Sequence, residues 1–218
     1  MIEKDPPMLF ISLMQPRELN VMLEATGAIL AGGKSLRMGA KKAMLRVGRQ
    51  LMVQRVADEL KKVFPEVIIS GDDQEVGGSL GLPVVPDLVS LGVPICGIHA
   101  ALHAARHPVV LAVACDMPFV TGNMAELMVS LVDGYDVAVP KRGEYLQPLF
   151  AVYCRSCLPA IEKRLSAGES KTTCFYEDVK VNYVDLEKYT GLDWEAVFFN
   201  VNTPGDLRKA RGLVRGEK

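Results

Sequence analysis

Short apolar segments alternate with amphipathic ones along the chain, which is typical of a mostly parallel sheet covered by helices. The clearest helix lies at 51–64, where apolar residues recur at intervals of three and four and polar residues fill the positions between them. The segment 109–115 is apolar almost throughout, as expected for a central strand buried on both faces. The pattern therefore predicts an α/β fold.

The same reasoning assigns most of the remaining chain. Strands are expected at 27–31, 67–70, 84–85, 109–115, 136–140, 148–153, 179–184 and 197–201. Further helices are expected at 95–107, at 121–132 with Thr121 as its cap, and at 157–165. A last helix should begin at Thr203-Pro204-Gly205-Asp206, because Thr is a good cap, Pro suits the first position and Asp can reach back from the third. The polar stretch 166–178 has no clear assignment.

Composition narrows the class of protein. The 218 residues are 49% hydrophobic and carry a formal net charge of −1, which suits one domain and disfavours a general nucleic-acid binder. No apolar run approaches the roughly 20 residues needed to cross a bilayer, so no membrane partner is expected. We interpret residues 1–24 as an N-terminal tail, disordered or not native, ahead of a single domain at 25–214. Translation starting at Met22 is one hypothesis for this tail, and mass spectrometry of the native protein would test it.

The five cysteines also bear on the cellular compartment in which the protein is expected. Their number is odd and no secretion signal precedes them, so a disulfide framework is not expected and a cytoplasmic location is the default. Cys154 and Cys157 form a Cys-x-x-Cys pair, but zinc would require a second such pair, and a redox motif would normally open a helix after the first strand. We therefore interpret both as structural cysteines.

The loop that follows the first expected strand has the composition of a phosphate-binding site. Two glycines, Gly32 and Gly33, are followed by the cations Lys34, Arg37 and Lys42. Glycine lets backbone N–H groups approach an anion, and the cations can neutralise phosphate oxygens. The alternative is a plain tight turn with solvated lysines. The spacing matches neither a P-loop nor Gly-x-Gly-x-x-Gly, so the loop indicates a nucleoside triphosphate site of another type.

Two aspartates follow apolar strands. Asp116 comes directly after the strand at 109–115, and open α/β sheets bind ligands at that edge. Because Mg²⁺ takes one or two carboxylates together with phosphate oxygens, Asp116 is a candidate ligand, although an Asp before Met117-Pro118 could also simply form a turn. Asp87 follows the short strand at 84–85, and taken alone it is best interpreted as a loop aspartate.

The three histidines, His99, His103 and His107, recur every four residues on one expected helix. Such spacing can serve zinc, but Ala100 stands where a metalloprotease requires Glu, and no carboxylate lies nearby in the sequence. A partly exposed helix face is the favoured interpretation.

Several motifs in order resemble one family. They are Leu30-Ala-Gly-Gly-Lys-Ser-Leu-Arg-Met-Gly39 with Lys42, Asp87 followed by Gly92-Val-Pro94 and Gly97, Cys115-Asp116-Met117-Pro118, Gln147-Pro148-Leu-Phe-Ala-Val-Tyr153, and Asn200-Val-Asn202-Thr-Pro204. Over residues 26 to 210 the chain resembles the molybdenum cofactor guanylyltransferases, which belong to the nucleotidyltransferases. The resemblance implies a Rossmann-like nucleotidyltransferase fold of three layers, α/β/α, with a mostly parallel central sheet.

The resemblance also implies roles for individual residues. The guanine nucleotide would be contacted by a set taken from the strand ends and the loop: Leu30, Ala31, Gly32, Gly33, Lys34, Lys42, Ser70, Asp87 and Asp116. Lys42, Arg37 and Asp116 would be the catalytic residues, with Asp116 as the Mg²⁺ ligand. The pterin cofactor would lie near Gln147, Pro148, Asn200 and Asn202, with 142–147 and 168–178 as further candidate segments. The resemblance equally allows Asn200 and Asn202 to lie near the metal.

Two departures from the family pattern stand out. Lys41 replaces the usual Asp before Lys42, which makes the loop more cationic, and Ser70 replaces an Asn near the base, which weakens any role there in base recognition. Relatives that use CTP tend to carry Leu-Ala-Ala-Gly, so Gly32 favours guanine.

The resemblance implies that the terminal phosphate of molybdopterin attacks the α-phosphorus of GTP and expels pyrophosphate. The nucleophile is already an anion, so no general base is needed, and the protein must mainly align two anions and offset their repulsion. Partners would be GTP and the molybdopterin cofactor, with contacts to other cofactor-biosynthesis proteins or acceptor apo-enzymes as a further possibility. Three alternatives stay open: a CTP-dependent molybdopterin cytidylyltransferase, another small-molecule nucleotidyltransferase, and a non-catalytic nucleotide-binding module.

Overall fold

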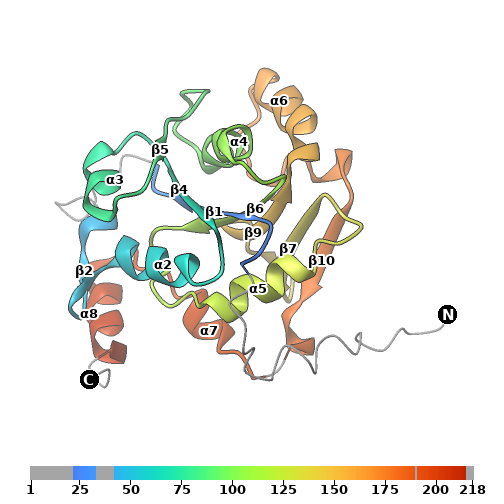
Figure 1. The fold of residues 1–218 in the computed structure, drawn as a ribbon. Coiled ribbons are helices and arrows are strands. Elements are labelled where there is room, and N and C mark those ends of the chain that lie inside the picture. Colours follow the sequence, from blue (N-terminus) through green and yellow to red (C-terminus); the bar gives the residue numbers. More distant parts are fainter. Residues whose placement is uncertain (1–21, 33–41, 190, 215–218) are drawn as a thin grey trace.

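A central β-sheet with helices on both faces organises the computed structural model, which describes residues 22–32, 42–189 and 191–214 (Figure 1). In these residues the sheet has eight strands. They are β1 (Thr26–Leu30), β4 (Glu66–Ser70), β5 (Val84–Val85), β6 (Val109–Ala114), β7 (Val137–Arg142), β8 (Tyr145–Leu146), β9 (Phe150–Cys154) and β10 (Val181–Asp185). A separate two-stranded hairpin joins β2 (Arg46–Val47) to β3 (Gln50–Leu51).

The remaining elements are helices and short 3₁₀ turns. The helices are α2 (Met52–Lys61), α3 (Gln74–Leu80), α4 (Pro94–Ala104), α5 (Gly122–Ser130), α6 (Leu158–Ser166), α7 (Trp194–Val197) and α8 (Pro204–Leu213). The 3₁₀ turns are η1 (Lys42–Met44), η2 (Arg155–Cys157), η3 (Tyr176–Asp178) and η4 (Leu186–Lys188).

Most strand pairs in the sheet are parallel, as the sequence predicted. The order is β10-β7-β9-β6-β1-β4-β5, with β8 paired to β7. β1 pairs in parallel with both β4 and β6, and Ala28 stands opposite Ile68 on one side and Ala112 on the other. β9 runs antiparallel to its two neighbours, β6 and β7. The carboxyl ends of β5, β4, β1 and β6 therefore meet at one edge of the sheet.

Two separate hydrophobic clusters cover the two faces of the sheet. Because successive strand residues point to opposite faces, Ile29 lies in one cluster while Ala28 and Leu30 lie in the other. The first cluster includes side chains of α2 and α5, and the second includes side chains of α4 and α6. Figure 1 shows these two helix pairs on opposite sides of the sheet. The expected three-layer α/β/α arrangement is thus confirmed.

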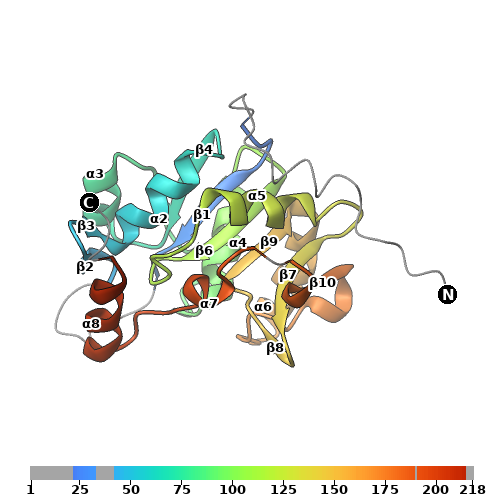
Figure 2. The same ribbon diagram turned by 90° about the horizontal axis from the view of Figure 1, so that it is seen from below.

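A third cluster joins the hairpin to the end of the chain. Val47 of β2 and Met52 at the start of α2 pack with Val201 and with Leu207 and Ala210 of α8. Arg211 Nε also donates to the Arg46 carbonyl oxygen at 3.0 Å. Figure 2 shows α8 beside this hairpin. This packing carries the segment before α8 to the carboxyl edge of the sheet.

Several expected boundaries agree with the structure. Thr121 caps α5 by accepting from the Met124 N–H, and Thr203 and Asp206 form a complete capping box at α8. The stretch 166–178, which had no assignment, contains η3. The helix expected at 95–107 ends at Ala104, so His107 lies beyond it.

The strand expected at 197–201 is wrong. Asp193 accepts from the Ala196 N–H and starts the short helix α7, which ends at Val197. Val197 and Val201 are both fully buried, but they belong to different hydrophobic clusters. The apolar pattern here reflects a connecting segment that serves two cores, rather than one face of a sheet. The hairpin β2–β3, helix α3 and strand β8 were not anticipated from the sequence.

The expected N-terminal tail lies mostly outside the described residues. Within them, the Leu23 N–H donates to the Val63 carbonyl oxygen at 2.9 Å. The division into a tail and a single domain stays a prediction.

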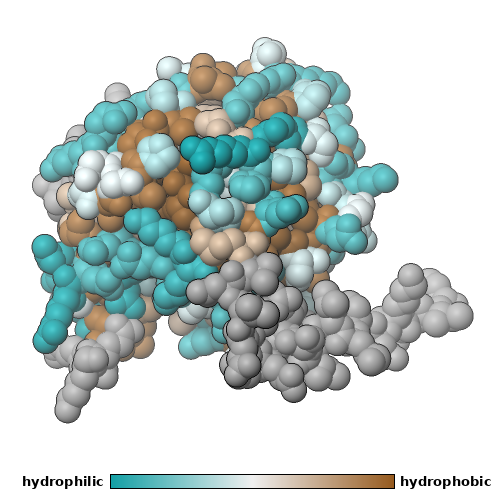
Figure 3. All heavy atoms as spheres, in the orientation of Figure 1, coloured by the Kyte–Doolittle hydropathy of each residue, from teal (hydrophilic) through white to brown (hydrophobic). Residues whose placement is uncertain are grey.

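None of the helices in the described part of the chain has the length and apolar character that spanning a bilayer requires. In Figure 3 hydrophilic residues form much of the outline of this face, and hydrophobic residues show between them nearer its centre.

Candidate functional site

The carboxyl edge of the parallel strands gathers most of the residues that the sequence singled out. Leu30 and Ser70 are the last residues of β1 and β4. Asp87 follows β5 by two residues, and Asp116 follows β6 by two residues. Because these four strands are neighbours and run in the same direction, their ends form one continuous edge.

Backbone hydrogen bonds fix Asp116 at this edge. The Cys115 N–H donates to the Leu30 carbonyl oxygen at 3.1 Å, which extends the pairing of β6 with β1 by one residue. The Val201 N–H donates to the Asp116 carbonyl oxygen at 3.0 Å. Asp116 is therefore held between the end of β1 and the segment that precedes α8.

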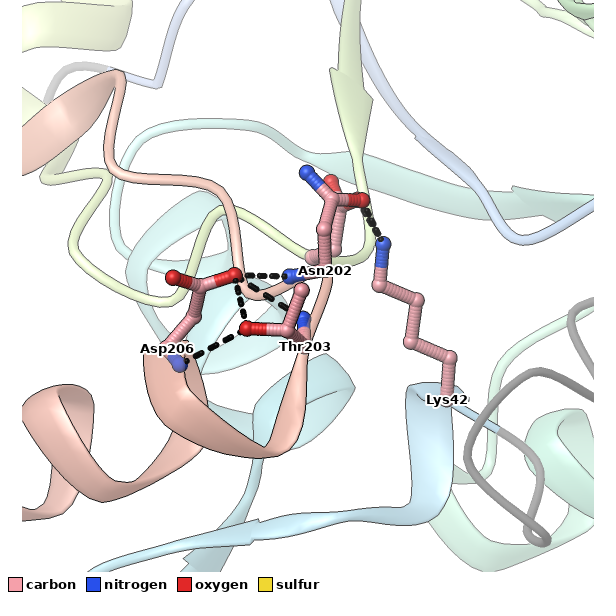
Figure 4. Close-up of polar contacts among 5 residues, drawn as sticks. Lys42, Asn202, Thr203 and Asp206 are labelled. Atoms are coloured by element: carbon pink, nitrogen blue, oxygen red, sulfur yellow. Dashed lines mark hydrogen bonds and ion pairs between the residues drawn. The ribbon is translucent and has the colours of Figure 1, made fainter.

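Lys42 reaches this carboxylate from η1. Its Nζ forms an ion pair with Asp116 Oδ2 and also donates to Asn202 Oδ1 at 2.6 Å. The Lys42 and Asp116 side chains keep only 13% and 18% of their surface exposed. Three segments that are far apart in the sequence thus meet at one ammonium group. Figure 4 shows the Lys42 side chain extended toward Asn202.

Asn202 is held in place by the capping box of α8. Asp206 Oδ2 accepts from the Asn202 N–H at 3.1 Å, from the Thr203 N–H at 2.9 Å and from Thr203 Oγ1 at 2.9 Å (Figure 4). The Thr203 hydroxyl holds the pKa of Asp206 below its usual value, so this acceptor is ionised at neutral pH. The box that begins the helix also fixes the backbone at Asn202, whose side-chain oxygen accepts from Lys42.

A second group of residues surrounds the start of α4. The buried Ser70 hydroxyl donates to the Gly97 carbonyl oxygen at 2.8 Å. A Cβ at Gly97 would lie 3.0 Å from Ser70 Oγ, 3.4 Å from Leu30 Cδ2 and 3.8 Å from Asp87 Oδ1. Four residues from β1, β4, α4 and the segment after β5 therefore lie close together, and glycine at 97 leaves space between them.

Asp87 has an unused acceptor in this group. Its Oδ1 is buried and has no hydrogen-bond partner among the described residues. Burial raises the pKa of Asp87, the charge of Asp72 raises it further, and His99 acts in the opposite direction. Since leaving a buried acceptor unpaired is costly, Asp87 is suited to receive an N–H or O–H donor from a ligand.

Cys115 is not available as a nucleophile at this edge. Burial raises the pKa of the Cys115 thiol to about 12, and the neighbouring Asp116 charge adds to that effect. The thiol is therefore protonated at physiological pH and is a poor nucleophile. The chemistry of this edge rests on charge and hydrogen bonding.

The residues expected near a pterin lie on two segments. The Ala114 N–H donates to the Leu149 carbonyl oxygen at 2.9 Å, which sets the Gln147-Pro148 segment beside the end of β6. The Pro148 carbonyl oxygen accepts from Tyr153 Oη at 2.7 Å. Asn202 contacts Lys42 as described, and Asn200 lies two residues before it.

Three of the candidate site residues, and one of the two departures from the family pattern, lie outside the described part of the chain. They are Gly33, Lys34 and Arg37, together with Lys41. Ala31 and Gly32 are described, and the Ala31 N–H donates to the Ser70 carbonyl oxygen at 2.9 Å. A Cβ at Gly32 would meet no atom of the described residues within 4 Å.

Three residues of this edge were not among the candidate site residues. A Cβ at Gly71, where φ is +141°, would lie 3.1 Å from the backbone of Ala31 and of Gly32, so glycine permits that close approach. Gly97 was noted only as part of a motif, and Asp206 only as a helix cap. The neighbours of Gly71 and Gly97 come from segments distant in sequence, which a local pattern does not show. Asp206 makes local contacts, and only the reach of Lys42 to Asn202 connects its capping box to the site.

The Cys-x-x-Cys pair lies elsewhere in the fold. Cys154 Sγ donates to the Tyr135 carbonyl oxygen at 3.5 Å, and Cys157 Sγ donates to that of Asp136 at 3.3 Å. Both are free thiols whose pKa values are raised, chiefly by burial. These contacts fit the interpretation as structural cysteines.

Comparisons with known proteins point to one family. A family model described as "MobA-like NTP transferase domain" matches residues 27–181. A protein of Pelotomaculum thermopropionicum named probable molybdenum cofactor guanylyltransferase is 55% identical over 198 residues, covering 90% of this chain and 97% of its own. One of the same name from Carboxydothermus hydrogenoformans is 34% identical, covering 86% and 95%. The crystal structure of molybdopterin-guanine dinucleotide biosynthesis protein A from Archaeoglobus fulgidus has a TM-score of 0.75 at 28% identity, covering 86% and 97%.

Proposed function

The chain belongs to the MobA-like NTP transferase family, and from this premise we propose that it transfers GMP from GTP to the molybdenum-loaded molybdopterin cofactor. The products would be the guanine dinucleotide form of the cofactor and pyrophosphate. The relatives' names support the reaction. The observation that carries the proposal is the contact of Lys42 with Asp116 and Asn202 at the carboxyl edge of the sheet.

The proposed step is a nucleophilic substitution at phosphorus. An oxygen of the acceptor's terminal phosphate forms a bond to the α-phosphorus of GTP. The bond from that phosphorus to the oxygen bridging to the β-phosphate breaks, and pyrophosphate leaves with the electron pair. Both reactants are anions, so the protein must bring them together and offset their repulsion.

Lys42 is suited to that task. Its ammonium group is largely shielded from solvent, which strengthens its interaction with an anion. It contacts both Asp116 and the Asn202 amide oxygen, so its position is set before a nucleotide arrives. The triphosphate would compete with Asp116 for Lys42, and this exchange would free the carboxylate.

The residues present fit a magnesium ion. Mg²⁺ prefers oxygen ligands and is usually bound by one or two protein carboxylates together with phosphate oxygens. Asp116 offers such a carboxylate beside Lys42, and Asn202 offers an amide oxygen. Bound there with the nucleotide, Mg²⁺ would neutralise phosphate charge and polarise the phosphoryl group. Arg37 and Lys34 are proposed to contribute further positive charge from the glycine-rich loop.

The group around Gly97 is proposed to receive the nucleoside. Asp87 Oδ1 is a buried acceptor without a partner among the described residues, and guanine presents N–H donors on its base-pairing edge. Ser70 already donates its hydroxyl proton to Gly97, so it would shape the pocket rather than donate to the base. Leu30 contributes apolar surface beside it.

The acceptor would enter from the other side of Asp116. Gln147 and Pro148 are proposed to contact the pterin cofactor, because their segment runs beside the end of β6. Asn200 and Asn202 would face it from the segment before α8. A cytoplasmic location belongs to the proposal as well, since GTP is a cytoplasmic metabolite.

Nucleotide competition tests the proposal. Pyrophosphate release by the full chain is measured with the pterin cofactor, Mg²⁺ and either GTP, CTP or ATP, and we expect GTP to be preferred. Preference for CTP would contradict guanylyl transfer and favour the cytidylyl alternative. Nucleotide binding without pyrophosphate release from any of the three would favour a non-catalytic module.

A matched pair of variants tests the site. Asp116→Ala should lower turnover by about 10²–10³-fold while the circular dichroism spectrum is unchanged, which is the usual effect of losing one group that stabilises the transition state. Asp133→Ala, at an exposed aspartate outside the site, should keep full turnover. Equal turnover in the two variants would remove Asp116 from the mechanism.

A further inference from the structure

A cluster of two histidines and one glutamate lies between α4 and α6, apart from the nucleotide edge. His99 and His103 stand four residues apart on α4, so their side chains share one face of the helix. Glu162 projects from α6, which lies beside α4 on the same side of the sheet (Figure 1). Within the described residues, this is the one group of three or more potential ligands whose ligand atoms converge.

The three side chains direct their ligand atoms at a common point. Glu162 Oε1 lies 2.9 Å from His103 Nε2 and 3.4 Å from His99 Nε2. All three atoms lie within 4.8 Å of one another. Tetrahedral zinc with bonds of roughly 2.1 Å separates neighbouring ligand atoms by about 3.4 Å. The cluster therefore needs only small side-chain movements to surround such an ion.

Burial differs among the three residues in a way that suits a metal site. The His99 side chain is only 6% exposed, whereas His103 and Glu162 are 41% and 48% exposed. An ion can thus reach the cluster from solvent while one ligand is anchored in the core. His99 Nδ1 is buried and has no hydrogen-bond partner among the described residues. Nε2, which lies 3.4 Å from Glu162 Oε1, is therefore the ring nitrogen that faces the cluster and is available to an ion.

We propose that His99, His103 and Glu162 bind one divalent transition-metal ion, for which Zn²⁺ is the best match, with the remaining coordination position open to solvent. Two imidazole nitrogens and one carboxylate oxygen form a donor set that zinc uses in proteins. Mg²⁺ prefers oxygen ligands throughout, so the same ion would not serve this cluster and Asp116.

The absence of a nearby carboxylate in the sequence disfavoured metal binding by these histidines. The structure supplies one from 59 residues beyond His103. It also separates His107 from the other two, because α4 ends at Ala104. Of the three regularly spaced histidines, two are therefore proposed ligands, and the third, His107, lies outside the cluster.

The bound ion would join two helices and reach toward the nucleotide pocket. It would link α4 to α6, and His99 lies only two residues beyond Gly97, whose carbonyl oxygen accepts from Ser70. Coordination through Nε2 places the ring proton of His99 on Nδ1, the buried atom without a described partner. The ion would hold the second half of α4 against α6 and stabilise the fold by binding only the native state.

Zinc titration of the untagged full chain tests the proposal. The titration is made with Mg²⁺ in large excess, so that oxygen-ligand sites such as Asp116 are occupied. We expect one Zn²⁺ per chain and a rise in the thermal midpoint. Co²⁺ in place of Zn²⁺ should give the visible absorption of a tetrahedral site.

Three variants decide the outcome. His103→Ala and Glu162→Gln change exposed side chains, so both should fold, and each should bind Zn²⁺ at least tenfold more weakly and lose the Co²⁺ absorption. His107→Ala is the matched control and should bind as the wild type does. Absence of stoichiometric binding to the wild type, or equal affinity in all four proteins, would overturn the proposal and leave the cluster as a hydrogen-bonded link between two helices.

Discussion

Lys42 illustrates how much of the candidate site depends on one side chain. Its ammonium contacts Asp116 from the end of β6 and Asn202 from the segment before α8. With little solvent access, these contacts are stronger than an exposed ion pair would be. The arrangement keeps a positive charge in position at the sheet edge, and an incoming phosphate would replace one anionic partner by another.

At the scale of single residues, Gly97 provides a test of whether the group around it receives the nucleotide. A Cβ at this position would lie 3.0 Å from Ser70 Oγ, closer than ordinary packing, and would fill space beside Leu30 and Asp87. Gly97→Ala should therefore weaken GTP binding by about tenfold, in line with the cost of overpacking. Isothermal titration with GTP and Mg²⁺ measures the change.

Two further variants interpret that result. Ser70→Ala combined with Gly97→Ala removes the crowded hydroxyl and should recover part of the affinity. Gly78→Ala is the matched control, because a Cβ there would meet no described atom within 4 Å. Equal GTP affinity in the Gly97 and Gly78 variants would mean that this pocket does not receive the nucleotide.

At the scale of elements, the start of α8 combines a structural and a positioning role. Asp206 Oδ2 accepts from the backbone N–H groups of Asn202 and Thr203, which begins the helix and fixes the backbone from which the Asn202 side chain contacts Lys42. Asp206→Ala should lower the thermal midpoint and also lower turnover about tenfold, because Lys42 loses a fixed partner. Pyrophosphate release and thermal unfolding measure the two effects.

A second capping aspartate, Asp193, serves to separate the structural role of Asp206 from its positioning role. Asp193 begins α7 by accepting from the Ala196 N–H at 3.0 Å and does not contact Asn202 in the described structure. Asp193→Ala should lower the thermal midpoint while turnover is retained. If the two variants lose turnover in proportion to their loss of stability, Asp206 acts only as a helix cap.

Elements with strong local signals were predictable from the sequence. Thr203-Pro204-Gly205-Asp206 carries its helix start in adjacent residues, and the buried strand β6 shows as an apolar run. The segment 197–201 carried an equally apolar pattern, yet Val197 and Val201 serve different cores. The two-residue strands of the β2–β3 hairpin are too short to show a period.

The residues of the candidate site also differ in whether a local sequence signal made them predictable. Lys42 and Asp116 were predictable because each sits in a local motif whose chemistry suits phosphate or Mg²⁺. Their contact with each other, and with Asn202, joins residues 74 and 160 positions apart. The partnership of His103 with Glu162 spans 59 positions and has no local signal. Such contacts come from sheet order and helix packing, which a sequence pattern does not encode directly.

At the scale of the whole molecule, the end of the sheet away from the nucleotide edge depends on Asp136. This carboxylate accepts from Ser156 Oγ and from the Lys180 N–H at 2.9 Å, so it connects the start of β7 to the segments before α6 and β10. The Ser156 hydroxyl, and next the Lys180 N–H, hold the pKa of Asp136 below the ordinary 3.8. Acid should therefore weaken this end of the fold.

The direction of the pH effect on stability follows from the linkage between proton binding and folding. Because the folded-state pKa is the lower one, the ionised form of Asp136 stabilises the protein fully above pH 3.8, and that contribution is lost as the pH falls through the folded-state value. Asp136→Asn should lower the free energy of unfolding by about 1 kcal/mol at pH 7. The difference from the wild type should shrink toward zero near pH 2.

Urea unfolding of both proteins at pH 7 and at pH 2–3 measures this difference. Asp133→Asn, at an exposed position three residues earlier on the chain, is the control and should follow the wild type at every pH. A difference between Asp136→Asn and the wild type that stays constant with pH would show that the substitution disturbs packing rather than a charge. A difference confined to neutral pH would establish that an ionised carboxylate holds the β7, β10 and α6 segments together, since the asparagine keeps the size of the side chain but loses its charge and one of the two oxygens that accept from Ser156 and Lys180.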